Sequence, residues 1–151
     1  MKIKRALVPL LIITCLCAAA AFAGTAEQEK AFTEKYKTAF EAKDTATLQS
    51  LLYTKDANPM ALEFYKVMMT EGAGGKISKI ELLDLSPEEA KKAEEILGPG
   101  GMKTRLPLKP TKKLKFTVET KDANGSSSST NVNFVAEQDG TFVIPVPVSI
   151  K

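Results

Sequence analysis

Alternation of apolar and polar residues along the C-terminal third constrains the fold of this chain more than any other feature. It extends over residues 113–120, 131–138 and 141–150, with apolar side chains at the even positions: Leu114, Phe116, Val118, Val132, Phe134, Ala136, Phe142, Ile144, Val146, Val148 and Ile150. A period of two predicts strands that bury one face against a core. We therefore expect an antiparallel sheet whose buried face carries the even-numbered residues.

Turn residues and prolines predict how these strands are joined and where they end. Asp139-Gly140 is typical of a tight hairpin between the last two strands. Asn124-Gly125 predicts an earlier turn, and we expect Ser126 to Ser129 to lengthen it into a mobile loop. Pro145 and Pro147 remove two N–H donors from the same side of the last strand. This strand is therefore expected to end as a sheet edge, or to run past the sheet at that point.

Helical signals fill the first half of the chain. Residues 26–43 carry Phe32, Tyr36, Ala39 and Phe40 at spacings of three and four, which predicts an amphipathic helix. Asp44 is the expected N-cap of a second, short helix. Asn58-Pro59 predicts the start of a third helix that ends at Gly72.

A strand and a short helix follow before the alternating segments. We expect the strand over residues 76–85. Ser86 and Glu89 form the capping box of a helix over 87–97, which the glycines of 98–101 end. Helices in one block and strands in another predict an α+β fold, with the N-terminal helices packed on one face of a curved, mainly antiparallel sheet.

The first 23 residues read as a cleavable signal peptide. Lys2, Lys4 and Arg5 precede an apolar run, and Ala21-Phe22-Ala23 predicts cleavage before Gly24. The run is shorter than the roughly 20 residues of a membrane-spanning helix, so we expect no stable membrane insertion after cleavage. Residues 24–151 are then one α+β domain, and the expected location is periplasmic or secreted.

Removal of this segment changes which kinds of chemistry are open to the protein. Three of the 21 basic residues lie in it, which leaves 18 against 18 acidic residues, so no global positive field attracts nucleic acid. Cys15 and Cys17 are lost with it, and the chain has no histidine. The mature domain therefore lacks disulfides, soft metal ligands and the commonest catalytic bases and nucleophiles. We expect no metal, no cofactor and no enzymatic activity.

Three segments carry a resemblance to a known superfamily. They are the helix end Phe40-Glu41-Ala42-Lys43-Asp44, the glycine-led strand of residues 75–80, and the terminal hairpin of residues 134–144. Together they resemble the nuclear transport factor 2-like superfamily, also called cystatin-like, and in particular its exported domains of unknown function. The resemblance implies a cone with an apolar pocket between helices and sheet. It implies no activity, because this fold hosts enzymes, carriers and interaction modules.

Aromatic and methionine side chains are the candidate ligand-binding residues. They are Tyr36, Phe40, Phe64, Tyr65, Met68 and Met102. Met and aromatic side chains adapt to varied ligands, although at helical spacing they also form ordinary core. An enzyme without histidine would instead need a buried carboxylate beside a tyrosine. Asp84 and Glu119 are the carboxylates to consider, and surface positions explain both more simply.

Two basic features remain. The lysines of residues 109–115 could contact anionic lipid or an acidic partner, but a solvated strand face explains them more simply. Arg105, the one arginine of the mature chain, is a candidate for carboxylate recognition.

These patterns together predict an exported, non-catalytic domain that binds a small apolar ligand or another envelope protein, with a homodimer across the sheet as one form. A carboxylate-based isomerase or dehydratase, and a structural interaction module with a filled core, are the alternatives. For the module, the open sheet face with Lys115, Thr117 and Glu119 would be the contact surface.

Overall fold

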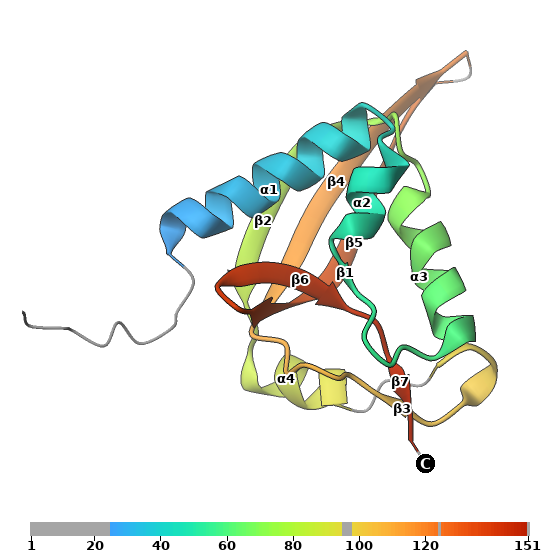
Figure 1. Cartoon of the computed structure of the whole chain (residues 1–151). Helices are drawn as coiled ribbons and strands as arrows, with labels where there is room; N and C mark the ends of the chain where they lie inside the picture. Colours follow the sequence, from blue (N-terminus) through green and yellow to red (C-terminus); the bar gives the residue numbers. More distant parts are fainter. Residues whose placement is uncertain (1–24, 95–97, 124, 151) are drawn as a thin grey trace, which may run out of the picture.

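A computed structural model describes residues 25–94, 98–123 and 125–150. The expected signal peptide, residues 1–23, lies outside these ranges, as do Leu97 and Asn124. Within them the chain is a mixed α+β structure in which helices pack against a mainly antiparallel sheet that is not closed (Figure 1).

Five strands form the main sheet in the order β1-β6-β5-β4-β2. Its antiparallel strands are β2 (Lys76–Asp84), β4 (Lys112–Asp122), β5 (Gly125–Gln138) and β6 (Thr141–Pro145). The two-residue strand β1 (Leu52–Tyr53) pairs with β6 in parallel. A separate pair joins β3 (Thr104–Arg105) to β7 (Val148–Ser149). No periodicity predicted β1 or β3, because two residues are too few to show one.

Three helices cover one face of the sheet, namely α1 (Ala26–Glu41), α2 (Thr45–Ser50) and α3 (Pro59–Thr70) (Figure 1). The short helix α4 (Pro87–Glu94) and the 3-10 turn η1 (Pro99–Gly101) lie at the end of the molecule near β3 and β7. Tyr36, Phe40 and Phe116 form the centre of the core, with ring centroids 5.0 to 6.1 Å apart. Aromatic rings at these separations bury large apolar areas and attract one another.

The predicted helix starts are confirmed by their cap hydrogen bonds. The Asp44 carboxylate accepts from the Thr47 N–H at 3.0 Å, and the Asn58 amide oxygen accepts from the N–H groups of Met60 and Ala61. The Ser86 capping box is also present, since its hydroxyl accepts from the Glu89 N–H and the Glu89 carboxylate from the Ser86 N–H. These signals are local, so the sequence predicts them without knowledge of the fold.

The hairpin at Asp139-Gly140 is confirmed, whereas the loop predicted at Ser126 to Ser129 is wrong. Asp139 and Gly140 have φ values of 51° and 75°, as a tight type I′ turn requires. The four serines belong to β5 and pair with β4, from Ser126 opposite Lys121 to Ser129 opposite Val118. Cross-strand backbone bonding holds them extended although their side chains have little preference for strands.

The predicted buried face is confirmed for β4 and β6, whereas in β5 it is wrong for Val132 and holds for Ala136. In β4 the side chains of Leu114, Phe116 and Val118 are buried. In β5 the buried residues Asn133 and Val135 are odd-numbered and Val132 is 52% exposed, although even-numbered Ala136, near the end of the strand, is buried as well. The register of the β4–β5 pair causes this, because Leu114 lies opposite Asn133 and so the two side chains share a face.

Pro145 and Pro147 lie where β6 has left its neighbour β5. The β5–β6 pairing ends with Ala136 opposite Val143. Beyond that point Ile144 and Val146 donate their N–H groups to the Leu51 and Tyr53 carbonyls, on the side of β1. The prolines lack donors on the opposite side, where none of the described strands pairs with them. Of the two predicted alternatives, the strand therefore runs past the sheet and is not its edge.

Strand β2 is an outer strand of the sheet, and α1 covers its backbone at Ile77. The Ile77 N–H donates to Glu41 Oε1 at 2.9 Å, and Lys37 Nζ donates to the Ile77 carbonyl at 3.0 Å. Lys37 and Glu41 also bond to each other, which lowers the pKa of Glu41; the Ile77 N–H acts in the same direction. These contacts occupy backbone groups that a free strand edge would leave open.

Candidate binding cleft

The helix-facing side of β5 is polar over most of its length. Ser129, Asn131 and Asn133 lie opposite Val118, Phe116 and Leu114 of β4, so their side chains point to the face that the core occupies. Toward its tip the β4–β5 hairpin projects beyond the helices (Figure 1). Polar side chains of β5 and apolar side chains of β4 therefore lie side by side on the helix-facing side of the sheet, where the buried core ends.

A cleft of about 480 Å³ lies between this face and the C-terminal end of α3. Met68 from α3, followed by Glu71 and Gly72, forms one wall. Strands β4 and β5 form the other, with Phe116, Val118, Thr120, Ser129, Asn131, Val132 and Asn133. The volume lies within the range of small-molecule sites in proteins.

Asn133 joins the floor of the cleft to the core. Its side chain is 7% exposed and is hydrogen-bonded to that of Tyr36, which is 1% exposed. Burial raises the pKa of Tyr36 well above its usual value, and the bond to Asn133 offsets part of this rise. The Tyr36 hydroxyl therefore remains protonated at physiological pH and helps to fix the orientation of the Asn133 amide.

The six residues predicted to bind ligand do not form one site. Met68 lines the cleft, and Tyr36 lies beneath its floor through its bond to Asn133. Phe40 is enclosed in the core, whereas Phe64 is 54% exposed on the outer side of α3, with Tyr65 half-buried beside it. Met102 is half-buried after η1, far along the chain, and its carbonyl accepts from the Gly98 N–H.

The polar residues of the cleft were absent from the sequence-based candidates. Asn131 and Asn133 look like solvent-facing positions as long as Val132 and Phe134 are assigned to the core, and Ser129 was assigned to a loop. The repeated Asn-Val-Asn over 131–133 was the available signal, because amides at two alternate positions share one face of a strand. Which face that is depends on pairing with β4 and cannot be read from this segment alone.

The carboxylates considered for catalysis lie on the surface. Both Asp84 and Glu119 are exposed, and Asp84 accepts from Lys112 Nζ at 2.7 Å. Lys112 also contacts Glu29 at 2.8 Å, and Lys113 pairs with Glu89. These pairs neutralise part of the basic cluster. Asp84 and Glu119 are thus surface residues, whereas the Lys112 and Lys113 side chains are largely covered, at 16% and 20% exposure.

Arg105 lies elsewhere, beside an open pocket of about 600 Å³ at the start of α3. Its neighbours there include Asn58, Val148 and Ile150. Within the described residues Arg105 forms no ion pair. Arg105 is exposed, and among the described residues no buried side-chain polar atom lacks a hydrogen-bond partner that a ligand beside Arg105 could supply.

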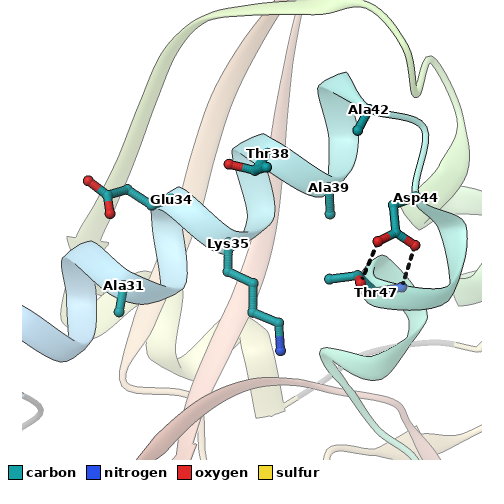
Figure 2. Close-up of a pocket in the computed structure, with 8 residues that line it drawn as sticks. All are labelled: Ala31, Glu34, Lys35, Thr38, Ala39, Ala42, Asp44 and Thr47. Atoms are coloured by element: carbon teal, nitrogen blue, oxygen red, sulfur yellow. Dashed lines mark hydrogen bonds between the residues drawn. The ribbon is translucent and has the colours of Figure 1, made fainter.

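A second groove, of about 470 Å³, separates α1 from α2 (Figure 2). Small side chains line most of it, such as Ala31, Ala39 and Ala42. Figure 2 shows the Asp44 carboxylate turned toward Thr47, where it accepts from the backbone N–H and the hydroxyl. Helix capping already engages this carboxylate, and the other charged lining residues, Glu34 and Lys35, are exposed, so the groove lacks a buried polar side chain such as Asn133 of the cleft.

In the described part of the chain no group of three or more His, Cys, Asp or Glu side chains is placed to hold a metal ion. Nor does any described helix have the length and apolar character needed to cross a membrane. No family model, curated protein or solved structure matches the chain. The resemblance to the nuclear transport factor 2-like superfamily therefore stays a prediction.

Proposed function

We propose that residues 24–151 form an exported, non-catalytic binding domain, and that the cleft between α3 and the β4–β5 hairpin takes a small molecule. The observation that carries this proposal is the polar inner face of β5. A sheet face turned toward helices normally holds apolar side chains, whereas here two amides and a hydroxyl accompany Phe116 and Val118.

The lining indicates the chemical class of ligand. Asn131 and Asn133 each offer donors and acceptors, and Ser129 and Thr120 add hydroxyls. Glu71 is the one charged residue among the lining residues. Met68 and Phe116 provide apolar contact beside them. This mixture suits an uncharged molecule with several hydroxyl or amide groups and one apolar surface, such as a short saccharide or a capped peptide.

The proposal is tested by native mass spectrometry of the protein purified from the periplasm of cells that express the full chain. We expect a bound small molecule in the wild type, loss of that mass in Asn131→Ala, and its retention in Thr130→Ala. Thr130 is the matched control because it neighbours Asn131 on β5 but points to the opposite face of the sheet.

Two results would overturn the proposal. One is an apo mass for the wild type, combined with no cleft amide shifts when ¹⁵N-labelled protein is titrated with soluble saccharides and capped peptides. The other is a bound molecule that both variants retain equally, because the ligand would then lie outside the cleft.

A further inference from the structure

The outer face of α3 is the most apolar exposed surface of the described residues. Five large apolar side chains of the described residues are exposed, and three of them lie on α3: Met60 at 57%, Phe64 at 54% and Val67 at 65%. Their spacing of four and three residues places them within about 60° of one another around the helix axis. Figure 1 shows α3 at the outside of the helical layer, beyond α2.

This surface, which we call the α3 patch, is larger than scattered exposed residues would give. Each of the three side chains leaves on the order of 100 Å² in contact with water, so the patch measures roughly 300 Å². Patches of this size on soluble proteins frequently serve as contact sites. The cleft does not explain the exposure of this patch, because Met68 is the single residue of α3 that lines the cleft.

We propose that the α3 patch binds a second copy of this chain in a two-fold symmetric dimer with α3 antiparallel to its counterpart. The pattern of the patch is self-complementary in that arrangement. A two-fold axis near Phe64 sets this ring against the same ring of the other copy, and sets Met60 against Val67 in both directions. All three apolar residues are then covered at once.

The charges around the patch fit a copy of itself better than a charged partner. Glu63 and Lys66, the only charged residues of α3, pair with each other at 2.7 Å. Residues 24–151 also carry equal numbers of acidic and basic residues. Two copies therefore approach without net repulsion, and no excess charge selects an acidic or basic protein.

The area predicts a weak dimer. Burial of the patch on both copies removes about 600 Å² from water, which is roughly half of the 1,200 Å² at the lower limit of specific interfaces. We expect a dissociation constant in the micromolar range. The open face of the sheet is a poorer candidate, because Val132 is the one large apolar side chain exposed there among the described residues, next to charged Lys115 and Glu81.

Sedimentation equilibrium from about 5 µM to 1 mM measures the dimer on protein exported from the full chain. We expect Phe64→Glu to weaken the association at least about tenfold. Val132→Glu is the matched control, with similar exposure on the sheet, and should leave the association unchanged. A wild type that is monomeric at 1 mM overturns the proposal. So does a dimer that Val132→Glu disrupts and Phe64→Glu does not.

Disulfide trapping tests the orientation. The two cysteines of the chain, Cys15 and Cys17, precede Gly24, so an introduced cysteine has no competitor in the mature domain. Oxidation of mixed Met60→Cys and Val67→Cys variants should favour the mixed disulfide over either homodimer. Preferential Met60→Cys homodimers would indicate parallel helices and contradict the proposal. Neither result depends on whether the cleft binds a ligand.

Discussion

Replacing Tyr36 by phenylalanine removes one hydroxyl from the protein interior and leaves the ring in place. The Asn133 side chain, 7% exposed, then loses a hydrogen-bond partner that water cannot readily replace. Loss of a buried hydrogen bond costs about 1–2 kcal/mol, so the free energy of unfolding should fall by that amount. The ring contacts with Phe40 and Phe116 remain.

Urea unfolding at pH 7 measures this change. The chain has no tryptophan, so circular dichroism at 222 nm is the suitable signal. Tyr65→Phe is the matched control, because Tyr65 is also partly buried but its hydroxyl has no hydrogen bond within the described residues. We expect the control to change the free energy of unfolding by less than about 0.5 kcal/mol.

The same variant should alter the response to alkaline pH. The pKa of Tyr36 is raised in the folded state, chiefly by burial, so its contribution to stability is complete below the unfolded pKa of about 10. That contribution is lost as pH rises above 10, because the unfolded chain releases the proton more readily. Tyr36→Phe should lose less stability than the wild type between pH 10 and 11.5. Equal losses would refute the burial of the Tyr36 hydroxyl. A Tyr36→Phe variant as stable as the wild type at pH 7 would refute its bond to Asn133.

Three further predictions concern the rest of the fold. Glu41→Gln should lower the urea midpoint at pH 7, and stability should then fall less steeply below pH 4.5. The reason is that the lowered pKa of Glu41 contributes stability above that pH. An unchanged acid profile would contradict the contacts of Glu41 with Lys37 and the Ile77 N–H. Gly75→Ala should lower the free energy of unfolding by about 1–3 kcal/mol, because the added Cβ would lie 2.7 Å from Val118 Cγ1. Combining it with Val118→Ala should relieve part of that strain in a double-mutant cycle, whereas additive costs would argue against the clash. Lys112→Ala should cost about 1 kcal/mol in thermal or urea unfolding, whereas exposed Lys115→Ala should be near neutral; equal effects would show that the ion pairs of Lys112 contribute nothing.

Much of the fold could be predicted because its signals are local. Asp44, Asn58 and Ser86 each mark a helix start through a hydrogen bond within three residues of the chain. Asp139-Gly140 likewise determines its own turn through two positive φ angles. Such features depend on backbone geometry over a few residues and need no information about distant segments.

The face of β5 could not be predicted in the same way. Val132, Phe134 and Ala136 satisfy the alternation better than Asn131, Asn133 and Val135 do, so the pattern of this segment alone favours the opposite face. The choice is made by pairing with β4, in which Leu114 lies opposite Asn133. Because the cleft depends on that choice, its polar residues were missed, while Met68 was found through the periodicity of α3.

The face of β5 that points toward the helices is the most direct test of this account. NOE spectra of the ¹³C,¹⁵N-labelled mature protein report it without any substitution. We expect cross-peaks between the Tyr36 ring and the side-chain amide protons of Asn133, with none between that ring and Val132 or Phe134. Cross-peaks from the Tyr36 ring to the Val132 methyls or the Phe134 ring would show the opposite register, with an apolar inner face and no polar cleft.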